Sequence, residues 1–487
     1  MIRRQVFHTI GFLIALLGLS MIFSIAWSIY YASNDLNALL KSSVISITFG
    51  LILFYFCKDE RKDNPISIRE GFAIVTLGWL FMVVFASLPF YLSGELKYTD
   101  AFFEAMSGLT TTGASILNHN TTFPISEMPK GLLFWRSFTQ FIGGMGIIVF
   151  SIAILPMLGM GGAQLFRAEV AGPTVDKFTP RVKQTAKLLW GIYVGFVLIL
   201  SLILKIEGMT WFDAFCHSFC TIATSGFSTQ NNSIESYSII IQWTIIIFMF
   251  LAASNFSLHY YFLSKGKFEY LKDKEFQYYI ILILIFSSLF FINIFNIEGY
   301  KYFGEAVRHS TFTAVSLLTT TGYANNNYET WPAMSQMLIF VLLFIGGSAG
   351  STTGGLKIIR TIVISKYLLC EIRRLLHPKG IFNITIGNKT IEDNVLNSTI
   401  AFYLFYIFIF IITAIVLSMT GLDFMTSLTA SASAIGNIGP GLGDIGPSDS
   451  WGHLSDFAKW LTSFCMLLGR LEIFTVLVLF SRSFWRV

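Results

Sequence analysis

Long apolar stretches alternate with shorter polar segments along the whole chain. Stretches of about 20 apolar residues are long enough to cross a membrane as helices. They fall at residues 10–32, 39–57, 72–93, 135–158, 186–205, 238–262, 277–297, 334–368, 396–419 and 456–481. The eighth stretch is too long for one plain crossing. The pattern predicts an all-α integral membrane protein with two N-terminal helices followed by eight further spans.

Composition favours the same class of protein. Of the 487 residues, 54% are hydrophobic and 13% charged, whereas soluble domains are usually about a quarter charged. The first apolar stretch follows Arg3 and Arg4 but is longer than a signal-peptide core, and no small-residue cleavage site follows it. We therefore interpret it as a retained membrane helix.

The basic residues indicate the orientation of the spans. With the N-terminus inside, the inner segments hold Arg3, Arg4, Lys58, Arg61, Lys62, Arg69, Arg167, Lys177, Arg181, Lys183, Lys187, Lys265, Lys267, Lys272, Lys274, Arg373, Arg374, Lys379, Lys389, Arg482 and Arg486. The outer segments clear of the spans hold only Lys97, Lys130, Lys301 and Arg308. Because cytoplasmic loops carry an excess of Lys and Arg, both termini are expected in the cytosol.

Four outer segments carry a similar polar stretch: "LTTTGAS" (109–115), "IATSGFS" (222–228), "LLTTTGYANN" (317–326) and "SAIGNIG" (433–439). An aspartate precedes the glycine by 13 residues in three of them (113 − 100, 226 − 213 and 436 − 423), whereas Glu305 precedes Gly322 by 17. Successive glycines are 113, 96 and 114 residues apart. This spacing predicts a fourfold repeat of span, short helix, glycine loop and span.

Such loops suit a cation. Non-helical backbone at membrane depth persists only where protein buries it or it lines a water-filled cavity. Four equivalent loops around one axis can point their carbonyls inward and replace an ion's hydration shell. The loops contain no ring of carboxylates, which favours a large, weakly hydrated monovalent cation. The candidate ion-binding residues are Thr111, Thr112, Gly113, Thr224, Ser225, Gly226, Thr320, Thr321, Gly322, Ile435, Gly436 and Asn437.

The eighth stretch contains "GGSAGSTTGGLK" (346–357). Its density of glycine and hydroxyl residues predicts an unwound segment below the loops that gates the pathway. The candidate gate residues are Gly346, Gly347, Gly350, Ser351, Thr352, Thr353, Gly354 and Gly355. The alternative is a helix-packing face made of small residues.

Two basic residues stand near this pathway. Arg470 lies inside the last span, where a charge is costly and normally faces a cavity or a partner. It is either an electrostatic barrier below the loops or one half of an ion pair with Glu472 or another acid. Lys357 is either a second charge beside the pathway or an anchor at a helix end.

These motifs, together with "GGMGIIVFSIAILPMLGMGG" (143–162) and "GRLEIFT" (469–475), resemble the Trk/Ktr/HKT superfamily of potassium transporters over nearly the whole chain. The two extra N-terminal spans favour the bacterial Trk type over the shorter Ktr type. The resemblance implies a potassium-selective pore of four linked M1–P–M2 units. Glycine in all four loops goes with potassium, whereas relatives with serine in the first tend to pass sodium.

The resemblance also implies an intramembrane loop that obstructs the pore, with Arg470 beside it, and a location in the bacterial cytoplasmic (inner) membrane. The expected assembly is a homodimer on a cytosolic ring of nucleotide-binding regulatory subunits. K⁺ is the expected transported ion. No cofactor is expected to bind this chain, which has no nucleotide-binding motif, and neither is nucleic acid.

The expected units are a helix pair (1–66) and four pore repeats (67–165, 166–270, 271–385 with the broken inner helix, and 386–487). One rival is a secondary transporter coupled to H⁺ or Na⁺, which predicts two inverted halves. A membrane-embedded enzyme is a second rival, but no paired acids, metal cluster or Ser/His arrangement is evident within the spans.

Overall fold

Helices account for most of this structure, which is a computed structural model. It describes residues 4–58, 67–117, 124–153, 178–266, 268–295, 302–380, 382–387 and 389–485. Some of the basic residues used for the topology lie outside the described residues: Arg3, Arg61, Lys62, Arg167, Lys177, Lys267, Lys301 and Arg486. The end of the 143–162 motif and the expected boundary at 165/166 also lie outside them.

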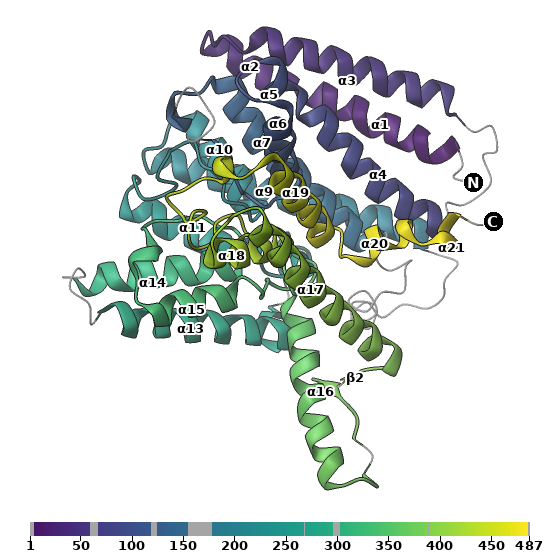
Figure 1. Cartoon of the computed structure of the whole chain (residues 1–487), viewed down its shortest axis with the longest axis vertical. Helices are drawn as coiled ribbons and strands as arrows, with labels where there is room; N and C mark the ends of the chain where they lie inside the picture. Colours follow the sequence, from purple (N-terminus) through teal and green to yellow (C-terminus); the bar gives the residue numbers. More distant parts are fainter. Residues whose placement is uncertain are drawn as a thin grey trace.

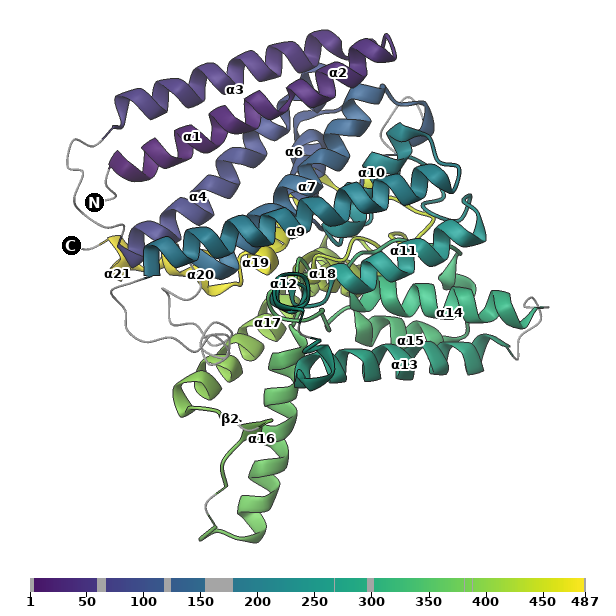
Figure 2. The same ribbon diagram turned by 180° about the vertical axis from the view of Figure 1, so that it is seen from behind.

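The N-terminal helix pair packs through glycine. α1 (Arg4–Ser20) continues into α2 (Ile22–Tyr30), and α3 (Leu36–Phe56) runs alongside α1 (Figures 1 and 2). A Cβ on Gly11 would lie 2.6 Å from Phe54 N, and one on Gly50 would lie 2.5 Å from Ala15 N. Small residues therefore let these two backbones approach closely, as in many membrane helix pairs.

The rest of the chain presents one order of elements four times: a long helix, a short helix that ends in a buried loop, and a further helical segment. The long helices are α4 (Ile68–Ala86) with α5 (Leu88–Leu92), α9 (Phe178–Ile206), α13 (Lys274–Phe295) and α17 (Asp393–Met419). The short helices are α6 (Tyr98–Leu109), α10 (Trp211–Ile222), α14 (Phe303–Leu318) and α18 (Phe424–Gly436).

The segments after the loops differ from one another. They are α7 (Lys130–Ala153), α11 (Ile239–Ala252) with α12 (Phe256–Lys265), α15 (Ala333–Leu342) with α16 (Ile358–Leu376), and α19 (Asp456–Arg470) with α20 (Phe474–Leu477) and α21 (Arg482–Trp485). Between α16 and α17 lies a hairpin of β1 (Thr385–Ile386) and β2 (Lys389–Thr390). The described residues also include five 3-10 turns: Ile125–Glu127, Tyr270–Lys272, Tyr328–Thr330, Trp451–His453 and Val478–Phe480.

Within the described residues, six helices are long and apolar enough to cross a membrane, or up to eight if each of two bent pairs counts as one span. The bends are 96° between α11 and α12 and 109° between α19 and the helical residues from Phe474. Neither bend is evident in the apolar pattern. The other two of the ten expected spans coincide with α7 and with α15 plus α16.

The two ends of the chain lie at the same end of the bundle, where α1 begins and α21 ends (Figures 1 and 2). α16 leaves the body at a steep angle to the other helices and projects from it beside the lower end of α17 (Figure 1). The last residues of the four short helices are buried, so the loops that follow them begin in the interior of the molecule.

A buried ion pair joins α6, the first short helix, to α19, a helix that follows the fourth loop. Lys459 Nζ of α19 lies 2.6 Å from Asp100 Oδ1 of α6, with side-chain exposures of 4% and 6%. The same ammonium donates to the carbonyl of Gly452 at 3.0 Å. Removing one partner of such a pair leaves the other charge buried without compensation.

We therefore expect Lys459→Met to destabilise the protein by about 3–5 kcal/mol. Thermal unfolding of the purified protein in detergent measures this. The control is Glu269→Gln, which breaks an exposed pair with Lys272 at 3.9 Å and is expected to cost about 0–1 kcal/mol. Equal melting temperatures for both variants would contradict the structural role of the buried pair.

Candidate functional site

The four loops share one backbone turn just before the glycine. In each loop, a backbone N–H donates to the carbonyl of the residue five positions earlier. The distance is 2.9 Å for Thr112 N to Ser107 O, for Ser225 N to Cys220 O and for Thr321 N to Ser316 O, and 3.1 Å for Ile438 N to Ser433 O. The residue before each donor has a positive φ: 51° at Thr111, 53° at Thr224, 52° at Thr320 and 53° at Asn437. Positive φ is uncommon outside glycine, so its recurrence at equivalent places identifies the four loops as counterparts.

This equivalence corrects the register expected for the fourth loop. Asn437 and Ile438 correspond to Thr111 and Thr112, so the glycine equivalent to Gly113 is Gly439. Gly436 is the last residue of α18, and Ile435 lies within that helix. The expected triplet of Ile435, Gly436 and Asn437 is therefore displaced, and only Asn437 lies in the loop itself.

The aspartate spacing misled because the acids stand at different places in their helices. Asp423 is the N-cap of α18 and accepts from Met425 N at 3.0 Å. Asp100 and Asp213 are instead the third residues of α6 and α10. The N-cap lies three positions before the third residue of a helix. Asp423 therefore precedes the loop glycine, Gly439, by 16 residues (439 − 423) and not by 13.

The loops contact one another in a closed ring. A Cβ on Gly113 would lie 2.5 Å from Gly226 N, and one on Gly226 would lie 2.8 Å from the carbonyl of Gly322. A Cβ on Gly322 would overlap the carbonyl oxygen of Ile438. One on Gly439 would lie 2.8 Å from Thr112 O, which returns to the first loop. No side chain larger than glycine's fits these places without movement.

The loops also hold oxygens that nothing in the described part of the chain satisfies. No hydrogen bond there reaches the carbonyls of Thr112, Ser225, Thr321 or Ile438. The hydroxyls of Thr111 and Ser225 are buried and without a partner. Buried carbonyls are nearly always paired, so this cluster of free acceptors is suited to a bound cation.

Directly next to the loops, the helical segment that follows the third loop is broken into α15 and α16. α15 ends at Leu342 and α16 begins at Ile358. The residues between them include the predicted gate sequence, and a parallel bridge between Ile345 and Leu356 closes them into a loop. The stretch is unwound, and so it does not form the alternative, a helix-packing face of small residues.

This unwound segment, residues 343–357, contacts three of the four repeats' short-helix ends. Gly354 N donates to Thr320 Oγ1 at 2.8 Å, and Thr352 Oγ1 donates to the carbonyl of Ile222 at 3.1 Å. A Cβ on Gly354 would lie 2.8 Å from Asn437 Cβ. The segment is therefore pressed against the second, third and fourth loops, with no room for larger side chains at its closest approach.

Glu275, at the start of α13, joins the middle of the unwound segment to the first turn of α16. Its Oε1 accepts from Ala349 N at 2.8 Å and from Ile359 N at 3.1 Å. Sequence reasoning missed this residue, because its partners lie 74 and 84 positions away. The only available signal was an acid at the edge of an apolar stretch.

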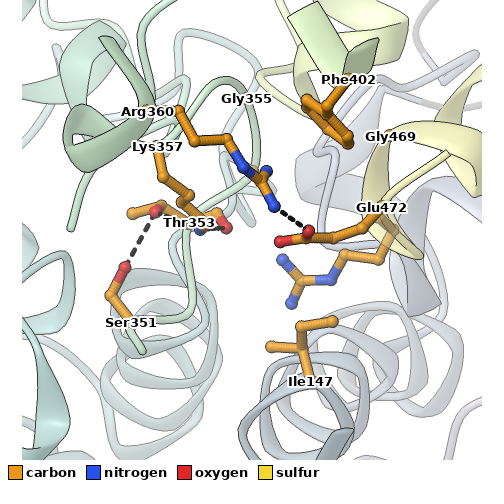
Figure 3. A pocket seen from close by; sticks show the side chains of 11 residues that line it. Ile147, Ser351, Thr353, Gly355, Lys357, Arg360, Phe402, Gly469 and Glu472 are labelled. Carbon is orange, nitrogen blue, oxygen red and sulfur yellow. Dashed lines mark hydrogen bonds and ion pairs between the residues drawn. The ribbon is translucent and has the colours of Figure 1, made fainter. Parts of the chain in front are cut away.

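A pocket beside the segment is lined by three basic residues and one acid (Figure 3). These are Lys357, Arg360, Arg470 and Glu472, which together leave an excess of two positive charges. Arg360 pairs with Glu472 and lies 4.0 Å from the ring centre of Phe402. The Lys357 ammonium donates to the hydroxyl of Thr353 at 2.8 Å and also to the carbonyl oxygen of Thr353. Lys357 is also the N-cap of α16, so it is at once a helix-end residue and a charge facing the pocket.

Arg470 makes no ion pair with a carboxylate in the described part of the chain. Its Nη1 donates to the carbonyl of Thr352 at 2.6 Å and its Nη2 to that of Gly143 at 3.4 Å. The expected alternative, a pair with Glu472, is wrong because Arg360 holds that carboxylate. Arg470 is 2% exposed, and its guanidinium lies against the unwound segment at Thr352.

Comparison with known proteins gives the same family throughout. A model of the TrkH family, described as cation transport protein, matches residues 36–486. Trk system potassium uptake protein TrkH of Vibrio parahaemolyticus is 36% identical, and that of Escherichia coli K12 is 37% identical, each over 99% of both chains. The crystal structure of the potassium transporter TrkH from Vibrio parahaemolyticus superposes with a TM-score of 0.91 at 34% identity, over 99% of both chains.

The anchoring role of Glu275 is testable by hydrogen exchange. In Glu275→Ala, the amides of Ala349 and Ile359 lose their acceptor and are expected to exchange faster. The control is Glu371→Ala, which removes an exposed pair with Arg374 elsewhere on α16. Unchanged exchange at both amides in Glu275→Ala would show that the carboxylate does not hold the segment.

Proposed function

Because the chain belongs to the TrkH family of cation transport proteins, we propose that it takes up K⁺ across a bacterial cytoplasmic membrane. The observation that carries this proposal is the ring of four buried loops with unpaired carbonyl oxygens. The relatives are named as potassium uptake proteins, and the chain is a transport protein and not an enzyme.

In this proposal, the loops form the selectivity filter. Thr111, Thr112 and Gly113 of the first loop, Thr224, Ser225 and Gly226 of the second, and Thr320, Thr321 and Gly322 of the third supply carbonyl oxygens. Asn437, Ile438 and Gly439 do so in the fourth. The oxygens replace the hydration shell of the ion. The uncharged ring suits a monovalent cation, because no carboxylate offsets the cost of dehydrating a divalent one.

The pore would be only approximately fourfold. The fourth loop has Asn437 and Ile438 where the others have Thr or Ser. The Asn437 side chain donates to Thr112 Oγ1 at 3.0 Å and to the carbonyl of Met466 at 2.9 Å. It thereby ties the fourth loop to the first. We assign the four M1–P–M2 units to residues 67–165, 166–270, 271–385 and 386–487.

The unwound segment 343–357 acts as the gate. Its small residues let it press against three loops, and Arg470 and Lys357 add positive charge beside it. A cation leaving the filter meets both a steric block and a like charge. Opening requires the segment to leave Thr320, Ile222 and the Arg470 guanidinium, so movement of the segment and loss of the charge barrier are coupled.

We further propose a homodimer that binds a cytosolic nucleotide-binding regulatory ring. A stripe of exposed apolar residues on the projecting helix α16 supports the dimer: Leu368, Leu369, Ile372, Leu375 and Leu376, with exposures of 57% to 82%. Basic residues on the segments expected to lie inside the cell support docking of an acidic cytosolic surface: Lys58, Arg69, Lys272, Lys274, Arg373, Arg374 and Lys379.

Ion flux into liposomes containing the purified protein tests the function. We expect K⁺ uptake that exceeds Na⁺ uptake and that proceeds down a K⁺ gradient alone. Flux that needs an opposing or accompanying H⁺ or Na⁺ gradient would instead favour the coupled transporter. Absence of K⁺ flux with the gate opened by Arg470→Ala would contradict potassium uptake.

The filter assignment is tested with serine substitutions. Gly113→Ser and Gly439→Ser each introduce a side chain into the ring and change its size, so both are expected to admit Na⁺. The measurement is the ratio of K⁺ to Na⁺ flux in liposomes. As a control, Gly195→Ser changes a glycine of α9 with no neighbouring atom within 4 Å of an added Cβ and no positive φ, and it should keep the wild-type ratio. An unchanged ratio in Gly439→Ser would refute the revised register.

The charge barrier is tested with Arg470→Ala. Two unit charges 4 Å apart repel by about 4 kcal/mol at an effective dielectric constant of 20. Water weakens this repulsion, and each 1.4 kcal/mol is about tenfold in rate, so K⁺ flux should rise by about tenfold. Because Arg470 pairs with no described carboxylate, its removal strands no acid. Lower flux with a lowered melting temperature would make Arg470 a structural residue.

A further inference from the structure

A second buried ion pair lies behind the first two loops. Glu104 of α6 and Arg136 of α7 approach at 2.6 Å between Oε1 and Nε, with side-chain exposures of 0% and 3%. The Arg136 guanidinium also lies 3.6 Å from the ring centre of Phe227, the residue after Gly226. No step of the proposed permeation or gating uses this pair.

Each partner holds the chain just beyond a filter glycine. Ser115 Oγ and Ile116 N donate to the Glu104 carboxylate at 3.0 Å and 3.1 Å. Arg136 Nη1 donates to the carbonyl of Ser228 at 2.8 Å. Ser115 and Ser228 both stand two residues after the glycine of their loop. The pair therefore connects equivalent points of the first and second loops.

The other repeats carry different residues at the place of Glu104, nine before the glycine. Those residues are His217 (226 − 9), Thr313 (322 − 9) and Ala430 (439 − 9). In the second repeat, His217 Nε2 lies 3.1 Å from Ser228 Oγ. His217 and Ser228 are 11 residues apart in the sequence, as are Glu104 and Ser115. Of these four positions, only the first holds a charge. The connection is thus specific to the contact between the first and second repeats.

We propose that Glu104 and Arg136 are positioning residues that set ion selectivity by fixing the spacing of the first two loops. This proposal rests on the assignment of the loops as the filter. A Cβ on Gly113 would lie 2.5 Å from Gly226 N, so a small displacement of either loop changes the opening between them. Discrimination between K⁺ and Na⁺ depends on the geometry and field of the surrounding carbonyls, and a loosened pair relaxes that geometry.

Glu104→Gln tests the proposal, since it keeps the shape of the side chain and removes its charge. We expect the ratio of K⁺ to Na⁺ flux in liposomes to fall about tenfold, which corresponds to about 1.4 kcal/mol. Arg136→Gln should lower the ratio in the same direction. A wild-type ratio in a folded Glu104→Gln protein would overturn the proposal.

The matched control is Asp100→Asn, which neutralises the other buried carboxylate of the same helix. Its ion-pair partner is Lys459 of α19, whereas Glu104 pairs with Arg136 of α7. We expect a lowered melting temperature with the wild-type flux ratio. If Asp100→Asn lowers the ratio as much as Glu104→Gln does, the effect is one of general destabilisation and the proposal fails.

Ser115→Ala covers the case in which Glu104→Gln does not fold. It removes the hydroxyl that donates to Glu104 and leaves the ion pair intact, so the ratio should fall by a smaller factor, about threefold, or about 0.7 kcal/mol. No fall would overturn the proposal. Wild-type protein that does not prefer K⁺ at all would instead refute the filter assignment.

Discussion

Carbonyl oxygens buried without a hydrogen-bond donor cost free energy unless a cation binds them, and the central feature of this protein is four loops that present such oxygens. The ring needs glycine at Gly113, Gly226, Gly322 and Gly439, because each approaches the backbone of a neighbouring loop. It needs four short helices to carry the loops inward. The longer helices around them supply the apolar exterior that a membrane requires.

Asymmetry between the repeats has a physical meaning in this account. The second, third and fourth inner segments are all interrupted, but only the third is extended into a segment long enough to reach its neighbours' loops. Glu275 holds that segment from one side and Arg470 from the other. These contacts tie the unwound segment to two charged groups, so in the proposed gating a change at either group is expected to alter the gate.

Much of the architecture was predictable from sequence, because apolar length and glycine-rich polar stretches are local signals. The register of the fourth loop was not: "SAIGNIG" offers two glycines three residues apart, and the aspartate spacing selected Gly436. The positive φ of Asn437 matches that of Thr111, which stands two residues before Gly113, and therefore identifies Gly439 as the loop glycine. The Arg360–Glu472 pair and the Glu275 anchor were also missed, since their partners are 112 and at least 74 residues apart. The bend at Asn255 could not be predicted, because no glycine or proline lies beside it in the sequence.

Diffraction from crystals grown with Tl⁺, a heavy substitute for K⁺, tests the central claim most directly. Anomalous scattering locates the ion without reference to flux or to variants. Our account predicts a peak enclosed by the four loops, within coordination distance of the carbonyls of Thr112, Ser225, Thr321 and Ile438. A ring that stays empty while Tl⁺ binds elsewhere in the chain would contradict it.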